Sequence, residues 1–133
     1  MANLVHPAEL RYSKTHEWVR VAGDEATIGI SDYAQDELGD VVSLDLPWDG
    51  VGRDMALDRH FGDIDSVKAT SELFTPVSGT LLKINEALRD APEFVNSDPY
   101  GEGWMLVIKL ANPSEVDAMM TRDQYLEFLK AQH

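Results

Sequence analysis

Hydrophobic and polar residues alternate in short runs through the first two thirds of the chain. HEWVRVAGDEATIGIS (residues 16–31) holds two such runs on either side of Gly23-Asp24, which predicts two strands joined by a tight turn. DVVSLDLP (40–47) predicts a further strand, and WMLVIKL (104–110) is the strongest strand pattern in the chain. Many short strands at regular spacing predict a mainly β fold, a sandwich or flattened barrel of antiparallel strands.

Helix signals are few, and each of them begins at a good capping residue. Ser31 is placed to cap a short helix through DYAQDEL (32–38), and Gly39 is a suitable residue to end it. Near the end of the chain, NPSE (112–115) combines an Asn cap, a proline and an acid, and TRDQ (121–124) has the residues of a capping box. Two short helices are therefore predicted to close the chain.

Length, charge and composition narrow the class of protein. One domain is expected over 1–133, with a β core over about 12–110 and C-terminal helices over about 113–131. The net charge of −13 repels phosphate backbones and anionic bilayers, so neither nucleic acid nor a membrane is an expected partner. Cysteine is absent, which excludes disulfides and thiolate chemistry. The opening MANLVHPAEL resembles neither a secretory signal nor a transit peptide, so a cytoplasmic protein of a prokaryote is expected.

No pattern of an active site or a metal centre is present in the sequence. The histidines have no HxxxH or HExxH spacing, so no metal site is expected, and His16 beside Trp18 is interpreted as structural. Neither a Walker sequence nor G-x-S-x-G occurs, and the many carboxylates include no isolated pair, which favours a solvated acidic face. No catalytic residue is assigned, and the protein is not expected to be an enzyme.

One lysine has an unusual setting. DIDSVKATSE (63–72) places Lys68 between two strand-like runs, 60–67 and 69–79, and so at the expected tip of a hairpin. Its neighbours are small or β-branched and leave room for an enzyme to approach the amine. The following TPVSG (75–79) predicts a proline-initiated turn that would hold the hairpin rigid. A rigid tip that presents a flexible amine suits post-translational acylation, although composition alone favours an ordinary surface lysine.

The residues around this lysine resemble the lipoyl-attachment segment of the glycine cleavage system H protein family. The resemblance extends from about Tyr12 to Leu129 and includes NSDPYGEGW (96–104), a second motif specific to the family. The family's usual E-S-V-K-A is represented by Asp65, Ser66, Val67, Lys68 and Ala69.

The resemblance implies a fold and a function. The family fold is a flattened antiparallel β-barrel or sandwich with short C-terminal helices, and Lys68 would carry lipoic acid as an amide. The monomeric protein would be a carrier that shuttles the aminomethyl group of glycine from a pyridoxal-phosphate-dependent glycine decarboxylase (P protein) to a folate-dependent aminomethyltransferase (T protein). A dihydrolipoyl dehydrogenase (L protein) would reoxidise this swinging arm, and lipoate-attaching enzymes would install it. By the same resemblance, an arm-cradling cleft is lined by Thr15, Glu17 and Glu72, and Glu37 stands where the family often has histidine.

The sequence also departs from the family pattern. Asp65 replaces the common glutamate, and segment 48–62 is longer than usual, with Leu57-Asp58-Arg59 where a glycine turn is common, which bears on partner docking. A biotinyl domain, or the lipoyl domain of another complex, fits less well because such modules lack the helical pair. An H-like protein that relays lipoate to other complexes and a binding module with unmodified Lys68 remain open. The other lysines expected at strand or helix positions, and unmodified, are Lys14, Lys83, Lys109 and Lys130.

Overall fold

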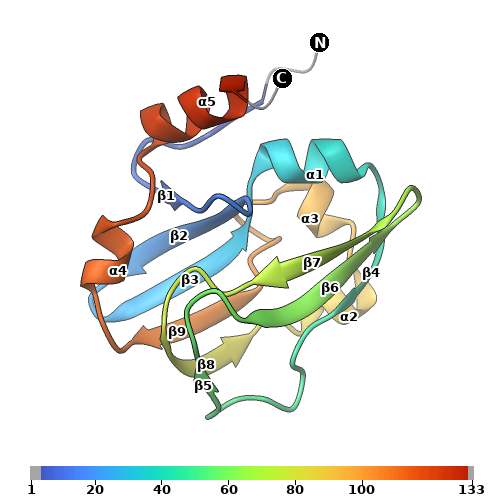
Figure 1. The fold of residues 1–133 in the computed structure, drawn as a ribbon. Helices are drawn as coiled ribbons and strands as arrows, with labels where there is room; N and C mark the ends of the chain where they lie inside the picture. Colours follow the sequence, from blue (N-terminus) through green and yellow to red (C-terminus); the bar gives the residue numbers. More distant parts are fainter. Residues whose placement is uncertain (1–3, 132–133) are drawn as a thin grey trace.

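The structure is a computed structural model that describes residues 4–131. Two antiparallel sheets pack against each other (Figure 1). The larger sheet has the strand order β1 (Arg11–Tyr12), β2 (Glu17–Ala22), β3 (Glu25–Ile30), β9 (Leu106–Leu110), β8 (Gly79–Ile84) and β5 (Asp54–Met55). The smaller sheet has the order β4 (Val41–Asp45), β6 (His60–Ser66) and β7 (Thr70–Phe74). Within 4–131 the sheets do not close into a barrel, so the predicted mainly β fold is confirmed in its sandwich form.

The main hydrophobic core lies between the two sheets. Val19 and Ile28 enter it from the larger sheet, and Ile64 and Leu73 enter it from the smaller one. All four side chains are almost completely buried, and burial of apolar surface is the dominant favourable contribution to folding. The register of β2 on β3 leaves Gly23-Asp24 as their connecting turn, as predicted.

Helix α1 (Asp32–Leu38) has the two ends that its sequence predicts. At its start, Ser31 Oγ accepts a hydrogen bond from the backbone N–H of Ala34 (3.2 Å). At its end, Gly39 has a φ of 74°, in the left-handed region that glycine adopts most readily. The helix therefore stops at Gly39, immediately before β4.

Two helices close the chain, again as predicted: α4 (Ser114–Asp117) and α5 (Arg122–Ala131). Asn112 Oδ1 accepts the N–H of the first residue of α4 (3.3 Å). Before α5, Thr121 Oγ1 accepts the N–H of Gln124 (3.3 Å), and Gln124 Oε1 accepts the N–H of Thr121 (2.9 Å). This reciprocal pair is a capping box, which satisfies N–H groups that have no partner inside the helix.

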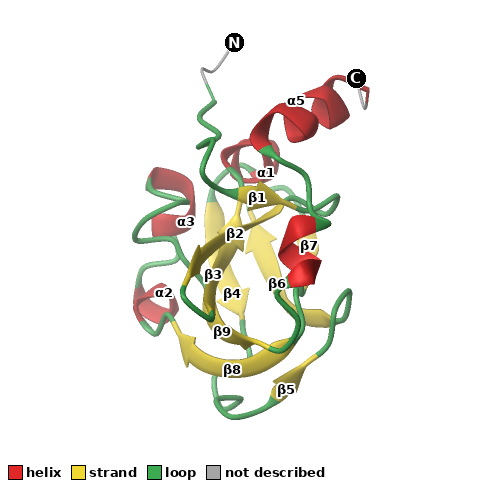
Figure 2. Ribbon diagram, turned by 90° about the vertical axis from the view of Figure 1, so that its left-hand side faces the viewer, coloured by secondary structure: helices red, strands yellow, loops and turns green. Residues whose placement is uncertain are grey.

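Two further helices are absent from the sequence-based prediction, α2 (Ala87–Asp90) and α3 (Phe94–Ser97). Each has four residues, which is too short for a helical period to appear in the sequence. Leu88 in α2 and Val95 in α3 are buried in the main core, so tertiary packing stabilises these turns. Figure 2 shows both helices on the same side of the sandwich.

A second, largely aromatic cluster lies beneath α5, which crosses above β1 and β2 in Figure 1. The rings of Tyr12 and Tyr125 stack with a centroid separation of 4.6 Å, and Trp18 Nε1 donates a hydrogen bond to the carbonyl of Pro99 (3.0 Å). The Tyr12–Tyr125 stacking and the contact of His16 Nδ1 with the Tyr125 hydroxyl (2.8 Å) hold β1 and the turn after it against α5. In the part of the chain that the structure describes, no helix is long and apolar enough to cross a membrane.

Candidate functional site

Lys68 lies in the turn between β6 and β7, so the predicted hairpin tip is confirmed. The turn is closed by a hydrogen bond from the N–H of Ser66 to the carbonyl of Ala69 (2.8 Å). Ser66 Oγ accepts the N–H groups of Lys68 (3.2 Å) and Ala69 (3.1 Å). The N–H of Val67 donates to the carbonyl of Asp40 (3.0 Å), which ties the tip to the segment after α1. A single hydroxyl and one neighbouring carbonyl thus order the backbone that presents the lysine.

The amine of Lys68 is exposed and has no acidic partner. Its Nζ donates to the backbone carbonyl of Glu37 (3.3 Å), and no carboxylate of residues 4–131 lies within ion-pair distance of it. The lysine stem passes close to Gly39, where a Cβ atom would lie 3.2 Å from Lys68 Cε. Glycine at this position therefore both permits the left-handed φ and leaves space for the stem.

The proline-initiated turn does not hold this hairpin tip, contrary to the sequence-based expectation. Thr75 and Pro76 follow the end of β7, and the five residues of that strand separate them from Lys68. The N–H of Thr75 bonds instead to the carbonyl of Arg59 (2.9 Å), at the opposite end of the hairpin. The rigidity of the tip comes from the bonds of Ser66 and Asp40.

The acid of the attachment motif is fixed by neighbouring hydroxyls. Asp65 Oδ1 accepts a hydrogen bond from Thr70 Oγ1 (2.6 Å), and Asp65 Oδ2 accepts one from Ser43 Oγ (3.1 Å). Val67 is 67% exposed, and Ala69 is also exposed. The end of β6 and the turn after it therefore present a held carboxylate, an exposed apolar side chain and an exposed amine close together.

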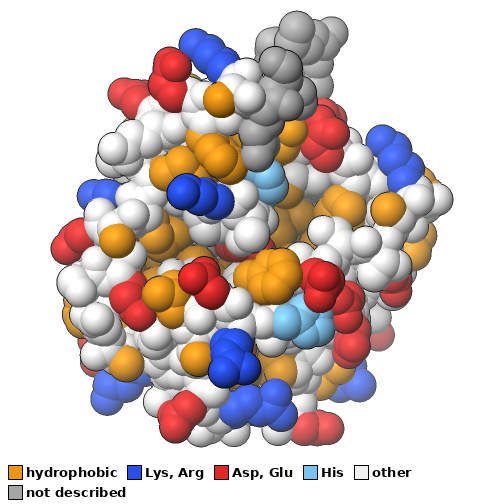
Figure 3. Space-filling view, viewed as in Figure 1, with side chains coloured by type: hydrophobic (Ala, Val, Ile, Leu, Met, Phe, Trp, Pro, Cys, Tyr) orange, Lys and Arg blue, Asp and Glu red, His pale blue; other side chains and the backbone are white. Residues whose placement is uncertain are grey.

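A cleft of about 310 Å³ lies beside this tip, between α1 and β7. Figure 3 shows the corresponding hollow, with hydrophobic side chains in its floor and acidic side chains at its rim. The amine of Lys68 bonds to the backbone of Glu37, one of the lining residues, so it rests at the edge of the cleft. The lining consists of Tyr33, Ala34, Glu37 and Leu38 from α1, Ile64, Ser71, Glu72 and Leu73 from β6 and β7, and Thr15, His16 and Ile30.

Of the three residues that the resemblance assigns to an arm-cradling cleft, Thr15 and Glu72 line this cleft and Glu17 does not. Glu17 is 1% exposed, and its carboxylate lies behind Thr15. It accepts hydrogen bonds from the hydroxyls of Ser13 (2.7 Å) and Thr15, and from the N–H of Phe74 (3.2 Å). Burial raises the pKa of Glu17 to about 7, although the hydrogen bonds from these donors act to lower it. The hydrogen bonds thus give Glu17 a supporting position beneath the cleft wall.

His16 is a cleft residue that the sequence analysis assigns only a structural part. Its ring Nδ1 lies 2.8 Å from the hydroxyl of Tyr125, and its backbone has a φ of 73°, unusual for a residue with a side chain. Burial lowers the pKa of His16 below its ordinary value, so the ring is neutral at physiological pH. The one sequence signal that His16 lies at the cleft is its position directly after Thr15, at the start of HEW (16–18).

The other lysines are also exposed, and three of the four lie in strands or a helix and not at a hairpin tip. Lys83, Lys109 and Lys130 lie in β8, β9 and α5, as predicted. Lys14 lies in the turn between β1 and β2 instead of a strand or helix. In segment 48–62, Asp58 has a φ of 65°, in the left-handed region that glycine, and less often aspartate, adopts.

Comparisons with known proteins agree with this geometry. A sequence model of the family described as Glycine cleavage H-protein matches residues 10–132. Proteins named glycine cleavage system H protein from Geobacillus thermodenitrificans and Bacillus subtilis are 53% and 49% identical to this chain, over 90% and 91% of its length and 92% and 94% of theirs. The crystal structure of a glycine cleavage system H protein from Mycobacterium marinum matches with a TM-score of 0.83 at 30% identity, and covers 92% of this chain and 97% of that one.

The fold, with its lysine-bearing hairpin, and the similarity to these proteins define a carrier protein and not an enzyme. The chain belongs to the glycine cleavage H-protein family, whose members are lipoyl carriers in glycine cleavage. The resemblance that the sequence suggested is thereby confirmed.

Proposed function

We propose that Lys68 is the residue that carries lipoic acid, joined to its Nζ as an amide. The observation that carries this proposal is the setting of the amine. It is exposed, it has no acidic partner among residues 4–131, and it lies at a hairpin tip whose backbone is ordered by the hydroxyl of Ser66. An attaching enzyme can reach such an amine without unfolding the protein. The Asp65 carboxylate beside it is a fixed feature for that enzyme to recognise.

The cleft has the chemistry to receive this group. Its floor is lined by the apolar side chains of Ile30, Leu38, Ile64 and Leu73, which suit a hydrocarbon chain with two sulfur atoms. When bound, the group supplies a dithiolane that can be opened, loaded and reoxidised, which no side chain of this cysteine-free protein can do.

Acidic residues at the cleft control which cargo is held there. Glu37 and Glu72 line it, and a carboxylate stabilises a nearby cation by Coulomb attraction, more strongly in a partly dry cleft than in water. Glu17 fixes the hydroxyl of Thr15 from behind, while the ring of His16 is held by Tyr125. These residues therefore favour a positively charged amine over a neutral or anionic cargo.

In the full proposal, the protein is a monomeric cytoplasmic carrier of the one-carbon unit of glycine. It would meet the glycine decarboxylase, the aminomethyltransferase and the dihydrolipoyl dehydrogenase in turn, after a lipoate-attaching enzyme has modified it. The family membership supports this sequence of partners, and the exposed tip gives each enzyme access to the same lysine.

The test is the intact mass of the protein from its native host, followed by peptide mapping. We expect one lipoyl increment, on the peptide that contains Lys68, and none in a Lys68→Arg variant expressed in the same host. An unmodified protein, or an increment that maps to another lysine, would contradict the proposal. Reconstitution with the three partner enzymes then separates glycine cleavage from a lipoate relay, because only the former exchanges the carboxyl group of glycine with bicarbonate.

A further inference from the structure

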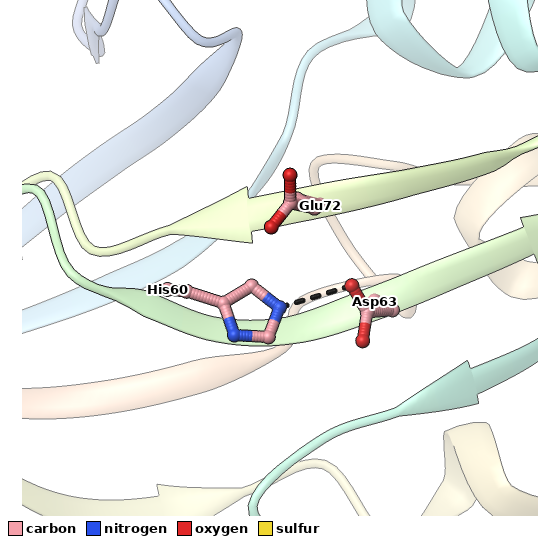
Figure 4. A group of neighbouring side chains, drawn as sticks. All are labelled: His60, Asp63 and Glu72. Atoms are coloured by element: carbon pink, nitrogen blue, oxygen red, sulfur yellow. Dashed lines mark hydrogen bonds and ion pairs between the residues drawn. The ribbon is translucent and has the colours of Figure 1, made fainter.

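Three side chains with metal-binding atoms meet on the solvent face of the β6–β7 hairpin (Figure 4). A ring nitrogen of His60, a carboxylate oxygen of Asp63 and a carboxylate oxygen of Glu72 all lie within 4.8 Å of one another. A cation that binds each ligand at about 2.1 Å holds its ligand atoms up to about 4.2 Å apart. Small side-chain rotations therefore bring all three atoms to bonding distance of one ion.

A β-bulge brings the first two ligands to the same face. Residues three apart in a regular strand point to opposite faces, so His60 and Asp63 would normally be separated by the sheet. The pairing of β6 with β7 shifts register between His60 and Gly62, which reverses this alternation. Phe61 then points into the core, and His60 and Asp63 both face the solvent. Gly62 permits close approach of β4, because a Cβ atom there would lie 2.3 Å from the carbonyl oxygen of Asp45.

The third ligand faces the second across the hairpin. Asp63 and Glu72 are direct partners in the β6–β7 register, and two carboxylates in that relation destabilise a sheet through their repulsion. Neither acid has a lysine or arginine within ion-pair distance in residues 4–131. Asp63 bonds only to His60 (2.9 Å), and the Glu72 carboxylate has no hydrogen-bonding partner in the same range. A bound cation would remove this repulsion and give Glu72 a partner.

The ligands are held by regular structure on both sides. All three come from paired strands and none from a free loop. The His60 ring also packs edge-on against Phe74, with centroids 6.2 Å apart and an interplanar angle of 66°. This support lowers the entropy that the side chains lose when they converge on an ion.

We propose that His60, Asp63 and Glu72 bind a divalent first-row transition-metal cation, of which Zn²⁺ is the probe of choice. One imidazole and two carboxylates suit Zn²⁺, Co²⁺ or Mn²⁺. Three protein ligands are too few for Ca²⁺, and Mg²⁺ prefers oxygen ligands alone. The side chains of His60 and Asp63 are 46% and 31% exposed, so water completes the coordination.

Histidine spacings within one helix or strand predict no metal site in this sequence. The ligands here are assembled by a bulge and by a cross-strand pair, and neither is visible as a spacing motif. The site does not depend on lipoylation of Lys68. Glu72 also lines the cleft, so the ion would lie at the cleft rim and withdraw one negative charge from it.

The experiment is calorimetric titration of Zn²⁺ into the full-length Lys68→Arg protein, purified without a histidine tag. The Lys68→Arg background carries no lipoyl sulfurs, which would themselves bind Zn²⁺. We expect one equivalent of Zn²⁺ to bind. The affinity for Zn²⁺ should fall by at least about tenfold in His60→Asn, Asp63→Asn and Glu72→Gln, because the loss of a residue that only supports a metal ligand already has an effect of this size. Glu25→Gln removes one charge from an exposed position on β3 and is the matched control, with unchanged affinity expected. Co²⁺ absorption gives an independent readout of the nitrogen ligand.

Four results would overturn the proposal. One is the absence of Zn²⁺ binding to the Lys68→Arg protein while circular dichroism shows it folded. A second is a loss of Zn²⁺ affinity in Glu25→Gln as large as in Glu72→Gln, and a third is unchanged affinity in His60→Asn. Either of these two would assign Zn²⁺ binding to diffuse acidic charge. Binding of Mg²⁺ as tight as that of Zn²⁺ would argue against the imidazole ligand in the same way.

Discussion

Two turns of this protein use a serine hydroxyl to place a charged side chain, with opposite results. In the β6–β7 turn, Ser66 Oγ accepts the N–H groups of Lys68 and Ala69, and the lysine stays exposed. In the β1–β2 turn, Ser13 Oγ accepts the N–H of Glu17 (3.0 Å) and donates to its carboxylate, and the glutamate is buried. The difference lies in what covers each turn. The end of β7 closes over Glu17 through the N–H of Phe74, whereas the Lys68 amine donates to the backbone carbonyl of Glu37 and stays exposed.

The comparison shows that local turn chemistry does not by itself decide the role of a charged residue. An exposed charged side chain remains available to another molecule, whereas a buried charged side chain becomes part of the packing and has its pKa altered. Lys68 is therefore a candidate for modification, and Glu17 is a candidate for a stability element. Four experiments test this distinction.

The largest effect is expected from Lys68→Ala. Attachment of lipoate and carrier activity should be lost completely, because no other amine occupies the hairpin tip. The free energy of unfolding should change by no more than about 0.5 kcal/mol, as for other exposed side chains. Thermal melting and an in vitro lipoylation assay measure the two quantities, and a large fall in melting temperature would place Lys68 in the packing.

Next in size is the dependence of stability on pH through Glu17. Its folded-state pKa of about 7 lies above the ordinary 4.5, so the folded protein holds a proton that the unfolded chain releases between these values. The stabilisation from this group is thus complete below pH 4.5 and is lost as the pH rises to about 7. A shift of about 2.5 units corresponds to a loss of about 3 kcal/mol at most.

Urea denaturation of wild type and Glu17→Gln between pH 5 and 8 measures this dependence. The glutamine variant cannot ionise, so its stability relative to wild type should increase as the pH rises. The difference between the two curves cancels the contribution of the other acids. Parallel curves would mean that Glu17 titrates normally and that its hydrogen bonds outweigh its burial.

A smaller effect is expected from the two serines, compared as a matched pair. Ser13→Ala removes one donor to a buried carboxylate and leaves the N–H of Glu17 without its acceptor, which should cost about 1–3 kcal/mol. Ser66→Ala affects only an exposed turn and should cost about 0.5 kcal/mol. The lipoylation rate should respond in the reverse order, falling for Ser66→Ala and staying constant for Ser13→Ala. Equal costs in stability would remove the distinction between the turns.

The smallest effect concerns a third hydroxyl, remote from the site. Thr121→Ala breaks the capping box of α5 and should lower the free energy of unfolding by about 1 kcal/mol. Lipoylation of Lys68 should be unaffected, because α5 packs on β1, on the other side of the molecule from the β6–β7 tip (Figure 1). A slower lipoylation rate in this variant would indicate that α5 belongs to a docking surface.

Much of this arrangement could be predicted from the sequence, where the signal is local. The strands around Gly23-Asp24, the caps at Ser31 and Thr121 and the hairpin at Lys68 each depend on residues within a few positions of one another. The family resemblance named Thr15 and Glu72, which line one cleft in the structure; that this cleft receives the lipoyl arm stays a prediction.

The remainder depends on tertiary contacts. The alternation of hydrophobic and polar residues does not show which face of β2 is covered. Glu17 is covered by the end of β7, where Phe74, 57 residues later in the chain, donates its N–H to the Glu17 carboxylate. Helices α2 and α3 exist because Leu88 and Val95 reach the core. The cluster of His60, Asp63 and Glu72 requires a bulge that leaves no mark in the pattern of hydrophobic residues.

The pairing of β3 with β9 places Glu25 opposite Lys109, residues from opposite ends of the chain. The larger sheet therefore cannot be completed until residues near 110 have been synthesised, whereas the β6–β7 hairpin needs only residues 60–74. Closing a long loop costs more entropy than closing a short one, so long-range pairing is the slower event. In pulse-labelled refolding, we expect amide protons of the hairpin to become protected before those of β9. The lysine-bearing turn would then already be shaped on a nascent chain whose cleft has yet to form.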